Sequence, residues 1–366
     1  MKKIVVLGAT GYAGGLVLEA LIRRGVRPVL AGSSEEKLAA LSAAHGDLEY
    51  QVADATELDS VRALVDAGGV LVTTVGPFNS LGLTVARAAA EQGAHYVDST
   101  GEVGFVRTLR ERHDAQARSA GAVMLPAFGN DYVPGFLAAG LAMRDGGQEV
   151  RRLDVGYFVD GSLRGGRGMS QGTRKTAIEG MTLPSLEYRS GNLVERRTAE
   201  TTRLFPVRDG SKRAILASGT EVLFLPGDFP QLESVSVYNG WMPRGSRIMP
   251  GVSRLLNAVS STEIGSRIIS AAASRLVGPP GGPDAVEREK TAARAVAVAT
   301  DAGGRVLAEA QVRGPSPYDL TGELIAWAAR ELAQGNPAHP GVVGPIEAFG
   351  LDGLIAACDG LGLRRG

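Results

Sequence analysis

Three glycines near the start of the chain, Gly8, Gly11 and Gly14, are spaced so that they could bind the diphosphate of a nucleotide. They follow a short apolar run, Ile4 to Leu7, and precede residues with helical apolar spacing. A strand that turns into a helix within two residues needs glycine, because a Cβ atom prevents positive φ and close backbone approach. The N–H groups and positive dipole end of the helix then attract phosphate. The spacing predicts a dinucleotide-binding loop, and a tight turn without a ligand is the alternative.

Further residues are expected to contact the rest of such a cofactor. No Asp or Glu stands at the end of the next apolar run, where it would bind the 2′-hydroxyl of NAD, so NADP is favoured and NAD is the alternative. Ser33 and Ser34 would lie near the adenosine ribose, although both serines, like Asp54, could simply cap helices. The expected contacts are Gly8, Thr10, Gly11, Tyr12 and Ala13 at the pyrophosphate, Ser33, Ser34 and Asp54 at the adenosine, and Val75, Gly76 and Pro77 at the nicotinamide.

A second group of polar residues could supply a proton. A donor must lie within about 3 Å of the atom it protonates, or reach it through one water. Tyr132 and Asp131 are the leading candidates, Asp98 and Glu102 flank the same predicted cleft, and His95 is a weaker candidate. The alternatives are a Tyr132 ring packed between domains, a Glu102 carboxylate that stabilises a helix start, and a His95 ring paired inside the sheet. If solvent supplies the proton, none of these groups is needed.

Alternating strand and helix patterns would position these residues. Together they predict an α/β fold, a doubly wound parallel sheet of the Rossmann type, over residues 1–130. Besides the first strand, the predicted strands are Arg27–Ala31, Glu49–Ala53, Val70–Thr74, Ala94–Asp98 and Ala122–Leu125. The predicted helices after the first are Glu35–Ala44, Glu57–Asp66, Leu81–Gln92 and Val103–Ser119.

Two reductase classes with similar openings are disfavoured. Short-chain dehydrogenases use Tyr-x-x-x-Lys to activate a phenol, and none of the eight tyrosines has a lysine four residues later. Semialdehyde reductases need a mid-chain cysteine to form a thioester. The single cysteine, Cys358, lies near the C-terminus among apolar residues and is interpreted as a packing residue.

Several short sequences carry a resemblance to a known family. They are Gly8–Gly14, Val75–Phe78, Gly93–Glu102 and Asp131–Pro134, with weaker matches at Gly278–Pro283 and Tyr318–Gly322. In these segments the chain resembles the saccharopine dehydrogenase-like oxidoreductases, including the trans-acting enoyl reductases of actinobacteria. The resemblance implies an NADP-linked reductase whose C-terminal helices, residues 316–366, return to pack on the Rossmann domain. The chain departs from the family pattern at two places. Gly32-Ser33 stands where relatives commonly have a Gly-Arg pair, and Gly129–Tyr132 differs from the Gly-Phe-Asp pattern of the enoyl reductases.

The pattern of short extended runs over residues 131–315 predicts an α+β domain with a mixed or antiparallel sheet. This domain is expected to select the substrate and to form the oligomer. A helix is expected at Gly172–Met181, after a glycine-rich segment at 165–170. An apolar stripe over 252–277 is expected to pack on its own protein or on a twin subunit, and contact with a membrane or a lipidic substrate is the alternative. An exposed sheet edge and this stripe together predict a homodimer. The predicted strands are Leu153–Asp160, Leu186–Arg189, Leu193–Arg196, Arg203–Val207, Arg213–Ala217, Glu221–Leu225 and Ser234–Tyr238, followed by a hairpin of Arg294–Thr300 and Arg305–Val312.

Composition narrows the class of protein. Basic and acidic residues number 39 each, so no net charge attracts nucleic acid or an anionic membrane. One cysteine excludes an internal disulfide and a cysteine-based metal cluster, so no metal site is predicted, and it fits a reducing compartment. No apolar run approaches the ~18 residues of a spanning helix, and a cytoplasmic location is predicted.

Two functions remain. The first is an NADP-dependent oxidoreductase that reduces a C=N or C=C bond of a small metabolite or biosynthetic intermediate by hydride transfer. The second is a non-catalytic nicotinamide-binding sensor or interaction module. Composition does not choose between them, whereas the family resemblance favours the enzyme.

Overall fold

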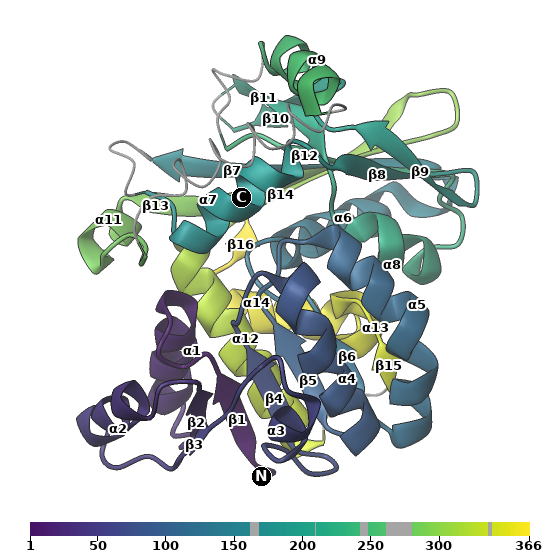
Figure 1. Ribbon diagram of the computed structural model, residues 1–366. Helices are drawn as coiled ribbons and strands as arrows, with labels where there is room; N and C mark the ends of the chain where they lie inside the picture. Colours follow the sequence, from purple (N-terminus) through teal and green to yellow (C-terminus); the bar gives the residue numbers. More distant parts are fainter. Residues whose placement is uncertain (162–167, 209, 242–247, 261–279, 336–338) are drawn as a thin grey trace. The chain divides into compact units, whose positions relative to one another are not determined.

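The chain forms two compact units. The computed structural model describes residues 1–161, 168–208, 210–241, 248–260, 280–335 and 339–366 (Figure 1). One unit contains Met1–Val133 and Tyr318–Leu361, and the other contains Pro134–Pro317 and Gly362–Gly366. The C-terminal segment therefore contributes to both units.

The first unit is built on a parallel sheet of seven strands within the described residues, in the order β15-β6-β5-β4-β1-β2-β3. The order reverses at β1 and β4, where ligands of such sheets bind beyond the carboxyl ends of the strands. The fold class predicted from the sequence is confirmed. The strands are β1 (Ile4–Leu7), β2 (Val29–Gly32), β3 (Tyr50–Val52), β4 (Val70–Thr73), β5 (His95–Asp98), β6 (Val123–Leu125) and β15 (Gly341–Val342).

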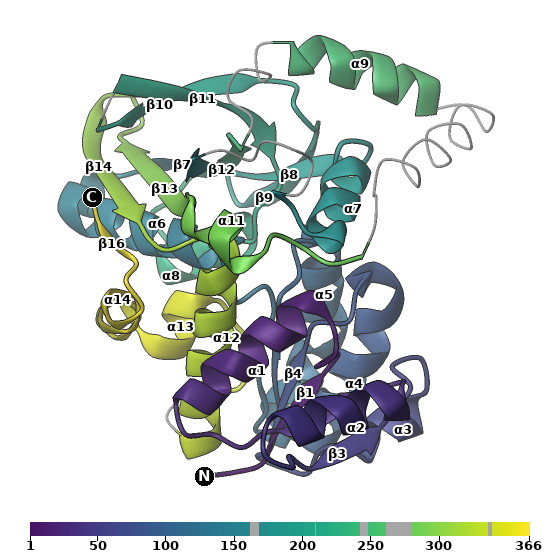
Figure 2. The same ribbon diagram turned by 90° about the vertical axis from the view of Figure 1, so that its left-hand side faces the viewer.

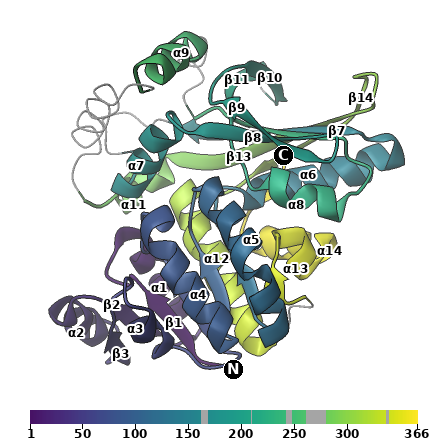
Figure 3. The same ribbon diagram turned by 45° about the vertical axis from the view of Figure 1, so that its right-hand side comes forward.

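Helices cover both faces of this sheet, as right-handed crossovers in two directions require. On one face α4 and α5 pack together, with α3 beside α4 (Figure 3). On the other face α1 and α12 lie side by side (Figure 2). They pack so closely that a Cβ atom at Gly322 of α12 would lie 3.0 Å from the backbone of Leu16 in α1. The helices are α1 (Tyr12–Arg23), α2 (Glu35–Ala44), α3 (Leu58–Arg62), η1 (Phe78–Gly82), α4 (Leu83–Gln92), α5 (Val103–Ala120), α12 (Pro317–Gln334), α13 (Pro345–Phe349) and α14 (Leu351–Gly360).

The second unit contains a mixed sheet of nine strands among the described residues. Its main path runs β10-β11-β12-β7-β13-β14-β16, and β8 pairs with β12 and β9. Only the β12–β7 pair is parallel among the strand pairs described in this sheet. The strands are β7 (Arg152–Gly161), β8 (Pro184–Arg189), β9 (Asn192–Arg197), β10 (Thr202–Val207), β11 (Gly210–Ala217), β12 (Ser234–Asn239), β13 (Thr291–Thr300), β14 (Val306–Arg313) and β16 (Arg364–Arg365).

One face of this sheet carries an apolar core around Phe158 and Phe205, whose rings meet edge to face at 5.8 Å. Beside this core, Asp160 accepts hydrogen bonds from Lys212 and Arg294. The helices of the unit are α6 (Val133–Gly146), η2 (Gly147–Glu149), α7 (Gln171–Gly180), α8 (Glu221–Asp228), α9 (Met249–Ser260) and α11 (Ala285–Glu289).

The strand predicted at Glu221–Leu225 is wrong, because these residues begin helix α8. A short apolar run suits a buried strand and a buried helix equally well, so its periodicity did not distinguish them. The first residue of this helix, Glu221, is buried, and its carboxylate accepts a hydrogen bond from the Tyr157 hydroxyl.

Some predictions fall on residues outside the described ranges. The apolar stripe over 252–277 and the glycine-rich segment at 165–170 do so in part. In the part of the chain that is described, no helix is both long enough and apolar enough to cross a membrane.

Candidate cofactor and proton-transfer site

The loop between β1 and α1 and the first turn of α1 have no room for side chains at Gly8 and Gly14. Gly8 has a φ of 87°, and a Cβ atom there would lie 2.9 Å from side-chain atoms of Thr74 and Val75. A Cβ atom at Gly14 would lie 2.8 Å from the Gly8 carbonyl carbon and 2.9 Å from Ala9 Cα, and closer still to the Gly8 carbonyl oxygen. The glycines therefore let the helix start pack directly on the strand end.

The N-terminus of α1 is suited to an anion. Its N-cap residue, Gly11, provides no side-chain hydrogen bond to the helix, and the first turn contains no acidic residue. Thr10 and Gly11 are exposed. No carboxylate in the first turn offsets the positive end of the α1 dipole. This end of the helix therefore suits a diphosphate.

The residues expected near the adenosine make capping contacts. The Ser34 hydroxyl accepts a hydrogen bond from Lys37 N at 3.4 Å and caps α2, while Ser33 is exposed. Asp54 Oδ1 accepts hydrogen bonds from the hydroxyl and backbone N–H of Thr56, at 2.7 and 2.8 Å, and these bonds lower the pKa of Asp54. Both side chains therefore have structural partners, and their contacts with the cofactor stay predictions.

Glu102 holds the loop expected at the nicotinamide. Its two carboxylate oxygens accept hydrogen bonds from Phe78 N at 2.9 Å and Asn79 N at 2.8 Å. These N–H groups directly follow Pro77, whose peptide bond with Gly76 is cis. Glu102 thus anchors the segment Val75–Pro77 through the first N–H groups of η1.

Asp98 joins two loops from inside the sheet. It is fully buried, and its Oδ1 accepts hydrogen bonds from Ala127 N at 2.7 Å and Thr100 N at 2.9 Å. Its Oδ2 is buried without a hydrogen-bond partner among the described residues. Burial raises the pKa of Asp98 to about 6, although the two backbone N–H groups oppose this shift. Asp98 is therefore placed to position backbone.

Tyr132 and Asp131 are neighbours in different surroundings. The Tyr132 hydroxyl donates a hydrogen bond to the Gly101 carbonyl oxygen at 2.9 Å, and only 7% of the residue is exposed. Tyr132 also has a φ of 99°, which is a strained value for an aromatic residue. Asp131 is partly exposed. Loss of hydration raises the pKa of Asp131 to about 6, although a hydrogen bond from Asn130 opposes this shift.

His95 is paired inside the sheet, as the structural alternative predicted. Its Nδ1 accepts a hydrogen bond from Val123 N at 3.0 Å, and burial lowers the pKa of the ring. This geometry accounts for the histidine without a role in proton transfer.

Sequence reasoning missed residues that support the loops. The Thr321 hydroxyl, on α12, accepts a hydrogen bond from Asn130 N at 3.0 Å. On the same helix, the Tyr318 ring lies edge to face against Tyr12, 5.5 Å between centroids. The only signal for these contacts was the weak family match at Tyr318–Gly322, because partners so far apart in sequence leave no local pattern.

Comparison with known proteins agrees with this geometry. Residues 4–125 match the family described as the saccharopine dehydrogenase NADP binding domain. This match covers about a third of the chain and the whole of its predicted Rossmann segment apart from the ends. The predicted resemblance and the predicted cofactor, NADP(H), are therefore confirmed for this domain.

Curated relatives match this chain over a longer stretch than the NADP-binding domain. A trans-acting enoyl reductase of Mycobacterium leprae is 39% identical over 137 residues, which cover 36% of this chain and 33% of that protein. A provisionally named trans-acting enoyl reductase of Mycobacterium tuberculosis is 35% identical over 192 residues, which cover 50% of this chain and 45% of that protein. The chain thus spans less than half the length of these curated relatives.

A solved structure shares the fold over the whole chain. Apo saccharopine dehydrogenase (L-Glu forming) from Saccharomyces cerevisiae superposes with a TM-score of 0.62, at 12% identity, and the match covers 100% of this chain and 99% of that one. At this identity the similarity establishes the fold alone, a Rossmann-like unit followed by a mixed sheet.

Proposed function

We propose that this protein is an NADPH-dependent reductase that transfers hydride to a C=N or C=C bond of a small metabolite or biosynthetic intermediate. The observation that supports it most is the uncapped N-terminus of α1 behind the glycine loop, together with the NADP-binding family match. When bound, NADPH would supply the hydride, and the protein would supply orientation, a dry site and a proton. The loop Gly8–Ala13 would hold the pyrophosphate, and Val75–Pro77 would lie at the nicotinamide.

Within this proposal Asp131 is the favoured proton donor among the four candidates. Asp98 is sealed from ligands, and both oxygens of Glu102 already accept backbone hydrogen bonds. The Tyr132 hydroxyl donates a hydrogen bond to the Gly101 carbonyl oxygen. Asp131 is partly exposed, and its pKa of about 6 keeps a useful fraction of the carboxyl protonated near neutral pH. Asp98, Glu102 and Tyr132 would act as positioning residues.

The bond reduced is proposed from the relatives. The named relatives at 35–39% identity are enoyl reductases, and this favours a C=C bond over the C=N bond. The departure at Gly129–Tyr132 from their loop pattern leaves the substrate itself open to test. A panel of enoyl thioesters and cyclic imines therefore forms the substrate set.

The test is NADPH oxidation by wild type, Asp131→Asn and the exposed control Asp66→Asn. We expect Asp131→Asn to lower kcat by roughly a hundredfold or more with unchanged NADPH affinity, while Asp66→Asn behaves as wild type. Wild-type kcat should fall as pH rises through about 6, because the acid must be protonated to donate. Equal turnover in Asp131→Asn would remove Asp131 as donor. NADPH binding without oxidation on any substrate would favour the sensor.

We also propose a homodimer formed through the second unit. The strands β9 and β10 each lie at an end of the described strand pairing, and they carry exposed Leu193 and Leu204, 39% and 52% exposed. Apolar side chains on unpaired edges favour association. Light scattering should report twice the chain mass at micromolar concentration, and Leu204→Lys should shift it to the monomer. A monomeric wild type would refute the proposal.

The predicted cytoplasmic location stays a prediction.

A further inference from the structure

The N-terminal part of helix α12 contacts two loops of the proposed reaction site. One contact is with the start of α1, which follows the glycine loop. The other is with the loop after β6, residues 126–132, which contains Asp131 and is called the donor loop below. The residues that make these contacts all belong to the first unit. A helix that contacts both loops can fix the position of one relative to the other.

The contact between α12 and α1 is close and repeats after one helical turn. The rings of Tyr12 and Tyr318 meet edge to face, with centroids 5.5 Å apart. Four residues further along each helix, a Cβ atom at Gly322 would lie 3.0 Å from the backbone of Leu16. Residues four apart lie on the same face of a helix, so both contacts belong to one interface. The first turn of α1 therefore cannot shift without displacing α12.

The contact between α12 and the donor loop involves the loop backbone. Thr321 Oγ1 accepts a hydrogen bond from Asn130 N at 3.0 Å. A Cβ atom at Gly129 would lie 2.9 Å from the Thr321 methyl carbon, so the loop backbone packs directly on this side chain. The Asn130 side chain, in a residue only 6% exposed, donates a hydrogen bond to Asp131. Thr321 thus holds the two residues that precede Asp131.

We propose that Tyr318 and Thr321 are positioning residues that keep the diphosphate-binding start of α1 and the donor loop in a fixed relation. The two residues are three apart in one helix and so move together. Binding of NADP at α1 should therefore order the donor loop. The roles of the two loops are those of the proposed function, on which this inference rests, whereas the contacts can be tested without turnover.

Hydrogen exchange of the donor loop, read by mass spectrometry, tests the coupling without a substrate. In wild type, saturating NADP⁺ should slow this exchange by roughly threefold or more. In Tyr318→Leu, with saturation verified by titration, the slowing should be lost. Tyr50→Leu, which changes an exposed tyrosine of β3, should retain it. Absence of slowing in wild type would overturn the proposal, and so would full slowing in Tyr318→Leu, because the loop would then respond to NADP⁺ without α12.

Substitution of Thr321 tests the second contact. Thr321→Val keeps the side-chain shape but removes the acceptor of the Asn130 N–H, so this amide should exchange roughly tenfold faster without ligand, the effect of one hydrogen bond. The kcat for NADPH oxidation should fall by about the same factor with an unchanged Kd for NADPH, and Thr321→Ser should restore both exchange and kcat. Thr108→Val, which removes a hydroxyl bonded within its own helix, is the matched control.

The outcomes separate this inference from the reductase itself. If Thr321→Val equals wild type in Asn130 exchange, or in kcat of an active enzyme, Thr321 is not a positioning residue. If wild type oxidises NADPH on no substrate, the proposed reductase activity is wrong, while the exchange measurements still decide whether α12 couples the loops. Thermal melts establish that each variant is folded.

Discussion

Replacing Gly14 by alanine should separate the cofactor loop from the helix that follows it. The new Cβ atom would lie 2.8 Å from the Gly8 carbonyl carbon, whereas ordinary contact begins at 3.4 Å. The two backbones must therefore separate by at least 0.6 Å, which is 3.4 minus 2.8. The clashing atoms are backbone, so no side-chain rotation relieves the overlap.

The expected consequence is weaker NADPH binding. The displaced segment carries the N–H groups that would meet the diphosphate, and a hydrogen bond to a charged group contributes about 2 kcal/mol. Losing one such bond raises the Kd for NADPH by roughly thirtyfold. Fluorescence titration of NADPH measures this change.

The next residue provides a matched control. A Cβ atom at Gly15 would meet nothing within 4 Å, so Gly15→Ala should leave the Kd unchanged and stabilise α1 by about 0.5–1 kcal/mol. Thermal melts of both variants measure stability. If Gly14→Ala remains folded and binds NADPH as tightly as Gly15→Ala, the assignment of this loop to the diphosphate is wrong.

Three further substitutions test carboxylates that bind backbone N–H groups or an arginine. Burial raises the pKa of Asp98 to about 6, so between pH 4 and 6 the folded state keeps a proton that the unfolded state releases. Asp98 by itself should therefore lower the free energy of unfolding by about 3 kcal/mol as pH rises through that window, and Asp131 should lower it further over the same window. Asp98→Asn should reduce this slope in urea titrations. Glu102→Ala leaves two N–H groups of η1 without their partner and should raise the KM for NADPH, whereas an unchanged KM would contradict the anchoring role. Asp160→Asn removes the carboxylate beside Arg294, which is 8% exposed, and should lower the free energy of unfolding by about 3 kcal/mol in guanidinium titrations; a loss below 1 kcal/mol would show that the pair contributes little.

The sequence alone determined the Rossmann architecture, because its signals are local. The glycine spacing lies within seven residues, and each strand and helix has its own apolar period. The helix predicted at Glu35–Ala44 has the same bounds in the structure. Right-handed crossovers then order the strands, so the position of the cofactor loop followed from the alternation of elements.

Only the tertiary structure decided what the polar residues of the site do. Asp98 and Glu102 were predicted from their places at the end of β5 and just after it, but their partners, Ala127 N and Phe78 N, come from other loops. Whether a carboxylate donates protons or fixes backbone depends on its hydration and on the N–H groups that approach it. Both depend on burial, and burial is a property of the packed chain.

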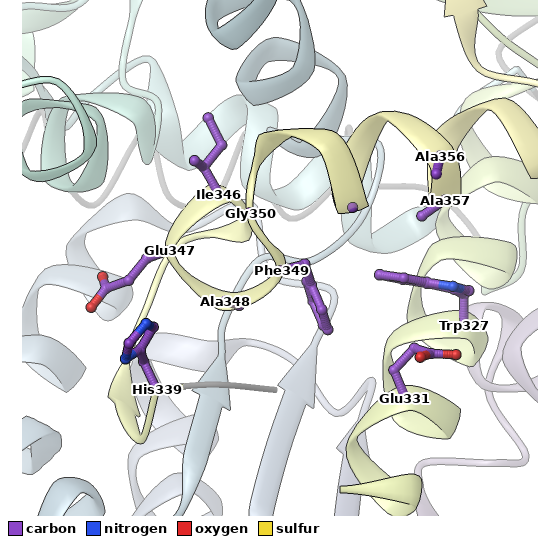
Figure 4. A pocket seen from close by; sticks show the side chains of 11 residues that line it. Trp327, Glu331, His339, Ile346, Glu347, Ala348, Phe349, Gly350, Ala356 and Ala357 are labelled. Atoms are coloured by element: carbon purple, nitrogen blue, oxygen red, sulfur yellow. The ribbon is translucent and has the colours of Figure 1, made fainter. Parts of the chain in front are cut away.

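The same reason explains Glu221 and the aromatic cluster of Phe128, Trp327 and Phe349. The short apolar run Glu221–Leu225 indicated a strand, whereas the structure forms a helix there, and the Tyr157 partner of Glu221 is 64 residues away. The cluster combines Trp327 of α12 with Phe349 of α13 (Figure 4), and Phe128 of the loop after β6 packs against both rings. Such contacts join distant segments and leave no periodic trace in the sequence, whereas the folded chain places them side by side.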